Sequence, residues 1–148
     1  MVLLRLNYAV ELRYGVLLEV AQKVFRHQPI DLTMPALNVI WQGDANSICL
    51  RALGATQTPP LVLNVTGPEK IFVKNLAEQF GKRFGHAPQF TGSEGASALL
   101  SNASRCRALF GSPSVSLDQM MDWVAAWVSA AGPTLGKPTH YEERAGRF

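Results

Sequence analysis

Short apolar runs alternate with segments of helical periodicity along the first ninety or so residues of this chain, and this alternation restricts the possible folds most. The runs have the length of strands, and the segments between them carry apolar residues every three or four positions. Alternating strands and helices are typical of α/β and α+β proteins. The expected strands cover residues 2–8, 38–41, 61–65 and 89–91, and the expected helices cover 14–26, 44–53, 73–84, 102–110 and a segment opened by Ser116. We therefore predict an α/β (α+β) fold with a small sheet and about five helices.

The first run, residues 2–8, is apolar at positions on both of its faces. This pattern predicts a strand that is buried inside a sheet. Such a strand needs a neighbour on each edge, and this one begins almost at residue 1. We expect the first strand to find a partner in a second copy of the chain, in a dimer.

Cap residues mark several helix ends. Asp44 is a candidate N-cap for the second helix. Gly85 fits a C-terminal cap, and Ser116 with Gln119 forms a capping box. In the second helix we expect four side chains to face inward: Ile48, Cys49, Ala52 and Leu53. The tail, 132–148, is rich in Gly and Pro and is predicted to be irregular.

Composition excludes several classes of protein. The 148 residues carry a net charge of only +3, and the basic residues are scattered, so we expect no nucleic-acid interface. No apolar run is long enough to span a bilayer, and we expect no membrane contact. Cys49 and Cys106 form no disulfide pattern and are expected to be buried thiols. Free thiols favour a reducing, cytoplasmic location.

Catalytic and cofactor motifs are weak or absent. The histidines are far apart in the sequence and have no partner at metal-ligand spacing. Cys106 between two arginines leaves a reactive thiol as a minor alternative. The turn from Gly92 to Gly95 imitates a dinucleotide-binding loop but lacks a solid preceding strand, so a flexible loop is favoured. No Tyr-x-x-x-Lys pair occurs anywhere in the chain.

Several segments, in order, resemble the second half of extended short-chain dehydrogenases, the NAD-dependent epimerase/dehydratase family. Arg5-Leu-Asn7 resembles the Arg-x-Asn stretch that follows a sheet strand in that family. Residues 28–32 resemble its Gly-x-Pro-Ile segment, and 38–44 resemble the segment that precedes an Ala-rich helix. Residues 63–67 resemble its Asn-Val-Gly stretch. The resemblance implies that 1–131 form the C-terminal, substrate-binding portion of a Rossmann-type fold.

The resemblance also implies a division of labour. In the family, an N-terminal Rossmann half holds NAD or NADP and carries the Tyr-x-x-x-Lys pair. This chain contains neither, so we expect no catalytic residue and no cofactor bound by this chain alone, with NAD or NADP used in the full-length parent. The residues expected to contact a small-molecule substrate, such as a sugar or sugar derivative, are Asn7, Tyr8, Arg13, Asn38 and Gln42.

One position departs from the family. Many of its sugar-nucleotide enzymes place an arginine where this chain has Leu37, and an arginine fork suits a diphosphate. A nucleotide-diphosphate sugar is therefore disfavoured. Two interpretations stay open: a portion of an NAD(P)-dependent enzyme that assembles as a homo-oligomer, or a stand-alone binding module derived from the same fold.

Overall fold

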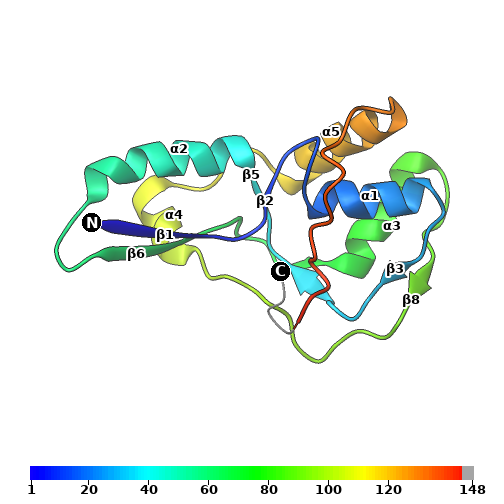
Figure 1. The fold of residues 1–148 in the computed structure, drawn as a ribbon, viewed down its shortest axis with the longest axis horizontal. Helices are drawn as coiled ribbons and strands as arrows, with labels where there is room; N and C mark the ends of the chain where they lie inside the picture. The colour runs from blue at the N-terminus through cyan, green and yellow to red at the C-terminus, as the bar shows by residue number, and fades with distance from the viewer. Residues whose placement is uncertain (145–148) are drawn as a thin grey trace.

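The computed structural model describes residues 1–144, which form an elongated molecule with two lobes (Figure 1). Each lobe has its own hydrophobic core. The smaller lobe is built from β1 (Val2–Leu6), β6 (Leu61–Val65), α2 (Gln42–Ala52) and α4 (Ser104–Phe110). The larger lobe is built from α1 (Val16–Phe25), α3 (Val73–Phe84), α5 (Leu117–Ser129) and short strands. Residues 1–144 contain five α-helices, so the prediction of a mixed α/β fold with about five helices is confirmed.

The strands form four separate pairs instead of one sheet. β1 and β6 pair in parallel over five residues, from Val2 opposite Leu61 to Leu6 opposite Val65. The other pairs are two residues long on each strand. They are β2 (Ala9–Val10) with β5 (Ile40–Trp41), β3 (Ile30–Asp31) with β8 (Phe90–Thr91), and β4 (Ala36–Leu37) with β7 (Ile71–Phe72). The predicted strand 38–41 is therefore wrong in its first half, because residues 38 and 39 lie between β4 and β5.

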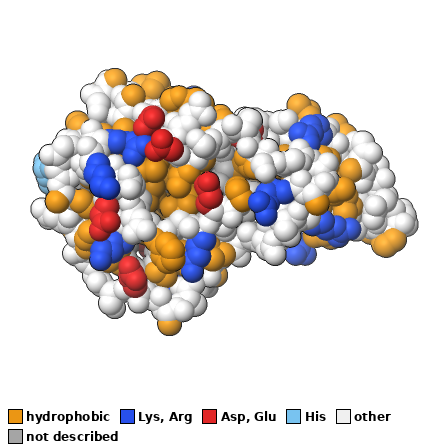
Figure 2. Space-filling model, turned by 180° about the vertical axis from the view of Figure 1, so that it is seen from behind, with side chains coloured by type: hydrophobic (Ala, Val, Ile, Leu, Met, Phe, Trp, Pro, Cys, Tyr) orange, Lys and Arg blue, Asp and Glu red, His pale blue; other side chains and the backbone are white. Residues whose placement is uncertain are grey.

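Strand β1 is not buried on both faces as predicted. Leu4 packs toward the core of the smaller lobe, whereas Leu3 is 44% exposed and Leu6 is 56% exposed. Among the described residues only β6 pairs with β1, so the other edge of β1 and its face with Leu3 and Arg5 remain uncovered. Figure 2 shows the smaller lobe from behind, with hydrophobic and basic side chains at its surface.

The predicted start of the second helix is wrong by two residues. Trp41 is the N-cap residue of α2, and Asp44 lies in the first turn. The Asp44 carboxylate instead accepts hydrogen bonds from Ser114 N and Oγ (3.0 and 2.7 Å) and from Val115 N (3.1 Å). Burial opposes ionisation of Asp44, but these hydrogen bonds outweigh it and lower its pKa below the ordinary value. Asp44 thus fixes the loop that leads into α5.

The inward face of α2 also differs from the prediction. Ala45, Ile48 and Ala52 are buried, at the three- and four-residue spacing of one helix face. Cys49 is exposed, and Leu53 is 70% exposed beyond the end of the helix. The expectation of two buried thiols is therefore correct only for Cys106.

In the larger lobe, α1, α3 and α5 pack against one another. Gly85 has a φ of 79° and ends α3 in the left-handed conformation, as predicted. The Ser116 side chain accepts a hydrogen bond from Gln119 N (3.2 Å) at the start of α5, as the capping box predicted. Arg83 of α3 binds both Asp118 and Asp122 of α5. Within residues 1–144, no helix has the length and hydrophobicity needed to cross a membrane.

The described part of the C-terminal tail, residues 132–144, contains no helix or strand but is firmly held along α1. Thr139 N and Oγ1 both donate to the Glu19 carboxylate (3.0 and 2.7 Å). Lys23 forms an ion pair with Glu142 (2.7 Å), and the Tyr141 side chain is fully buried in the core. The tail is therefore part of the packing of the larger lobe.

The buried tyrosine should make stability depend on alkaline pH. Burial raises the pKa of Tyr141 far above its ordinary value, and the Glu142 and Glu19 carboxylates add to the shift. The unfolded chain ionises this phenol near pH 10, so stability is complete below pH 10 and falls as the pH rises above it. We expect the Tyr141 contribution to unfolding free energy to fall by about 1.4 kcal/mol at pH 11. Urea denaturation between pH 8 and 11 measures this.

Tyr141→Phe is the matched control, because it keeps the ring and removes the ionisable group. The variant should lose less stability above pH 10 than the wild type. Equal losses in the two proteins would show that other groups cause the pH dependence.

Candidate functional site

The carboxyl ends of β1 and β6 meet at the junction between the lobes, where Asn7 and Thr66 follow the two strands. Backbone hydrogen bonds join the segments there: Asn7 N donates to Val65 O (3.0 Å), Ile40 N to Tyr8 O (3.2 Å) and Gly67 N to Val39 O (3.0 Å). In α/β folds, ligands bind outside the carboxyl ends of parallel strands. This junction is the candidate site.

Tyr8 adopts an uncommon backbone conformation at this junction. Its φ is 41°, in the left-handed region that residues other than glycine seldom occupy. Burial of part of the side chain raises its pKa above the ordinary value. Strained residues of this kind cluster at functional sites, where the surrounding structure stabilises them.

Asn38 is 5% exposed and ties two loops together. Its side-chain nitrogen donates to Glu69 O (3.0 Å), and its side-chain oxygen accepts from Ser101 N (2.9 Å). Beside it lies a cavity of about 270 Å³, which we call the Asn38 cavity. Its lining comprises Asn38, Gly67, Pro68, Lys70, Leu100–Ser104 and Arg107. It includes two basic side chains and no carboxylate, so it suits a ligand with polar or anionic groups.

Gly67 permits the close approach of two backbone segments at the junction. A Cβ atom on this residue would lie 2.1 Å from Val39 O. On the other side of Gly67 and Pro68 lies a second cavity of about 250 Å³, lined in part by residues 112–116 and Met120. The glycine thus separates two small cavities without filling either.

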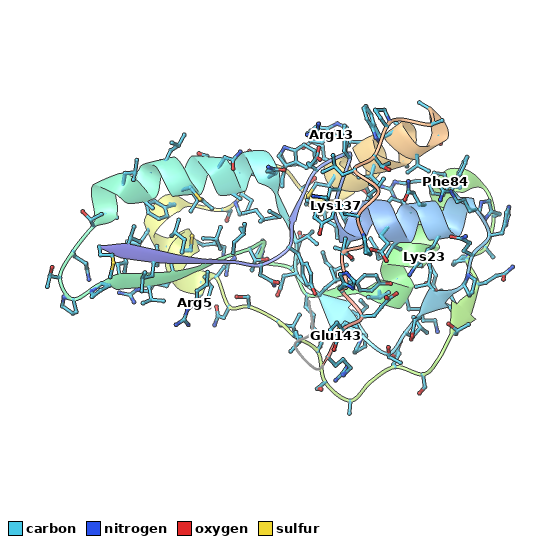
Figure 3. The ribbon with its side chains drawn as sticks, in the orientation of Figure 1. Arg5, Arg13, Lys23, Phe84, Lys137 and Glu143 are labelled. Atoms are coloured by element: carbon cyan, nitrogen blue, oxygen red, sulfur yellow. The ribbon has the colours of Figure 1, made fainter. Side chains whose placement is uncertain are left out.

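The structure brings three of the five predicted site residues to this junction and leaves two elsewhere. Asn7, Tyr8 and Asn38 lie on the converging segments. Arg13 is exposed, pairs with Glu11 and lies beside the tail (Figure 3). Gln42 is exposed at the first position of α2.

Other residues of the site were missed by the sequence analysis. Lys70 and Arg107 line the Asn38 cavity, and the Lys70 ammonium lies 4.8 Å from the centre of the Phe72 ring. Asn102 also lines this cavity, and its side-chain oxygen accepts a hydrogen bond from Ser104 N (2.9 Å). These residues lie over thirty positions from Asn38, so no local pattern in the sequence predicts that they meet it. The one local signal among them is the Asn-x-Ser pattern at 102–104, which is typical of a turn.

Metal binding and a reactive cysteine are the two alternative chemistries to be compared with residues 1–144. No group of three or more His, Cys, Asp or Glu side chains there could hold a metal ion. Folding does bring the ring centroids of His27 and His86 to 4.1 Å, with the ring planes tilted by 33°, although the two residues are distant in sequence. Burial raises the pKa of the Cys106 thiol, which disfavours a reactive thiolate, despite an opposing effect of Arg51.

The loop that begins at Gly92 does not form a dinucleotide-binding turn. The preceding strand, β8, has two residues, and the next helix, α4, begins only at Ser104. A dinucleotide turn requires a helix N-terminus directly after the glycines to hold the pyrophosphate. The residues present therefore do not fit NAD or NADP at this loop.

The tight contact at Gly67 generates a prediction. Gly67→Ala should destabilise the protein by about 2 kcal/mol, because the new methyl group overlaps Val39 O and must displace the backbone. Gly54→Ala is the matched control, because nothing lies within 4 Å of the added Cβ there. Thermal and urea denaturation measure both variants. Equal stabilities of the two would contradict the close approach.

Comparison with known proteins places the fold. No protein-family model and no curated protein sequence matches the chain. Solved structures do match. The UDP-glucose 4-epimerase of Thermus thermophilus in complex with NAD matches with a TM-score of 0.68 at 16% identity, over 86% of this chain and 46% of that one. The UDP-glucuronic acid 4-epimerase of Bacillus cereus, in complex with UDP-glucuronic acid and NAD, matches with a TM-score of 0.70 at 15% identity.

The match to the Bacillus cereus enzyme covers 88% of this chain and 45% of that epimerase. A UDP-glucose 4-epimerase of Thermotoga maritima, with UDP-glucose, matches with a TM-score of 0.68 at 15% identity, over 86% and 45%. The chain thus spans less than half the length of the structures it matches. It has the α/β fold of the matched part of these epimerases.

Proposed function

We propose that this chain is the substrate-binding portion of an NAD(P)-dependent epimerase/dehydratase-type enzyme whose cofactor-binding half lies outside these residues. The observation that carries the proposal is the structural likeness, which covers 86–88% of this chain but only 45–46% of the epimerases. The uncovered edge and face of β1 support it, because a parallel strand of a cofactor-binding half would complete the pair into a sheet.

The proposed binding site is the junction at Asn7, Tyr8 and the Asn38 cavity, and the substrate is a small molecule such as a sugar derivative. Asn7 offers an amide and Tyr8 a phenol at the ends of the strands, where they would orient polar substrate groups. Asn38 acts differently: its amide nitrogen donates to Glu69 O and its amide oxygen accepts from Ser101 N, so it positions the two loops that form the cavity.

Leu37 supports a substrate other than the usual nucleotide-diphosphate sugar. The side chain is 1% exposed and sits in β4, so it is part of the core. In the proposed site, charge would come from Lys70 and Arg107 at the Asn38 cavity.

In the proposed enzyme, NAD or NADP bound to the other half would supply hydride transfer. The residues of this chain would bind and orient the substrate and exclude water from one side of it. The cytoplasmic location favoured by the free cysteines and the homo-oligomeric state are part of this proposal.

A stand-alone binding module is the second candidate. The exposed Leu3 and Leu6 of β1 favour it, because an uncovered strand is a ready surface for another protein. The genomic reading frame separates the two candidates. A Gly-x-x-Gly-x-x-Gly turn and a Tyr-x-x-x-Lys pair encoded in frame before residue 1 would support the enzyme, and an open reading frame without them would contradict it.

The kinetics of the proposed full-length enzyme test the site. Asn7→Ala in that protein should reduce kcat/KM for its substrate by about tenfold or more, because a hydrogen bond at the substrate is lost. Asn46→Ala, on the exposed face of α2, is the matched control and should leave kcat/KM unchanged. An Asn7→Ala enzyme with full activity would remove Asn7 from the site.

The 148-residue chain by itself should not bind NAD(H) with micromolar affinity, because the loop at Gly92 lacks the helix that a pyrophosphate requires. Isothermal titration calorimetry with NAD and NADH measures this. Saturable micromolar binding would show that this chain holds a cofactor site after all.

The chain alone should also self-associate through β1, because an unpaired strand edge with exposed leucines favours pairing. Leu3→Lys should abolish association, since a lysine at an edge opposes pairing. Leu50→Lys is the matched control, because Leu50 is an exposed leucine on α2. Sedimentation velocity at rising concentration measures all three proteins, and a stable wild-type monomer would contradict the prediction.

A further inference from the structure

A groove runs along α1 on the side where the C-terminal tail passes. On the helix side it is lined by Leu18, Glu19 and Gln22 of α1 and by the cap residues Gly15 and Arg26 at its two ends. The tail closes the other side with Thr134 and residues 136–139. The groove has a volume of about 370 Å³, within the range of small-molecule sites, and shares no lining residue with the Asn38 cavity.

Positive charge in this groove is not compensated by its lining. Arg13, Arg26 and Lys137 face it, and Glu19 is its one carboxylate among the described residues. Glu19 is already engaged, because it accepts two hydrogen bonds from Thr139 and pairs with Lys23 at 3.4 Å. Figure 3 shows Arg13 and Lys137 on the same side of the molecule, where the tail passes the start of α1.

Two of the three cations are free to bind a ligand. Arg13 pairs with Glu11 at 3.2 Å. No hydrogen bond or ion pair joins Arg26 or Lys137 to any other side chain in the described part of the chain. Gln22, Thr134 and Tyr14 add uncharged hydrogen-bonding groups to the lining. Together they offer the donors that a phosphate or carboxylate group requires.

The groove is held open by contacts on both sides of Lys137. Leu135 N donates to Arg13 O (3.0 Å) before it, and Thr139 is bound to Glu19 after it. The buried Tyr141 anchors the tail beyond that point. A preformed groove of this kind loses little conformational entropy when a ligand binds.

We propose that the groove between α1 and the tail is a second binding site, which takes a small anion with two or more negative charges, carried on phosphate or carboxylate groups. The ligand bridges Arg26 of the helix and Lys137 of the tail. This site is independent of the substrate site at the strand ends.

Calorimetric titration of the 148-residue chain with inorganic pyrophosphate, and separately with malonate, tests the proposal. We expect saturable binding of at least one of them, weakened by added sodium chloride. Arg26→Gln and Lys137→Gln should each weaken that binding about threefold to tenfold, because each removes one charge-assisted contact. Lys74→Gln, at an exposed position of α3, is the matched control and should bind as the wild type does.

The pattern of outcomes is decisive. Binding of pyrophosphate alone identifies a phosphoryl ligand, binding of malonate alone a dicarboxylate, and binding of both a general dianion site; each supports the proposal. Absence of saturable binding by either probe overturns it, as does equal weakening in Lys74→Gln. Lys137→Arg keeps the charge and should retain binding, which separates loss of the contact from misfolding. Asn7→Ala should leave this binding unchanged, so failure here is distinct from failure of the proposed substrate site.

Discussion

The parallel pairing of β1 with β6 constrains the path of the chain between the two strands. Two parallel neighbours cannot be joined by a tight turn, so the chain between residues 7 and 60 must return to the start of the pair. It does so through α2, which runs back along the smaller lobe. The segment between β1 and α2 carries α1 and four short strands, and it leaves and rejoins at the same end of the pair. The junction between the lobes is therefore also the carboxyl end of the parallel strands.

This geometry explains why the site is made from loops that are distant in the sequence. Residues 7–8, 38–40 and 66–67 meet because each ends or begins a crossing between the lobes. Asn38 then joins two further loops through the two ends of one buried amide. Buried amides of this kind specify an arrangement well, because losing one contact leaves a polar group unpaired.

Local signals in the sequence predicted the elements whose ends depend on neighbouring residues. Leu61–Val65, Val73–Phe84 and the Ser116 cap were predicted correctly, because alternation, periodicity and capping act within a few residues. Asp44 was misassigned, since its carboxylate serves Ser114, seventy residues later. Leu3 was expected to be buried, but burial depends on a covering segment that a strand's own sequence does not encode. Cation pairs such as Lys70 with Arg107 were invisible for the same reason.

The order of the elements has a mechanical consequence for the two lobes. The chain passes between them after β1, before α2, after β6, before α4 and after α4. Two lobes joined by a single chain segment can rotate freely relative to each other. Two lobes joined by five segments can rotate only if several of those segments bend together. Asp44 adds a tie between α2 and the last of these crossings. A ligand at the junction would therefore meet a nearly rigid frame, and no single cut in the chain would yield two separately folded lobes.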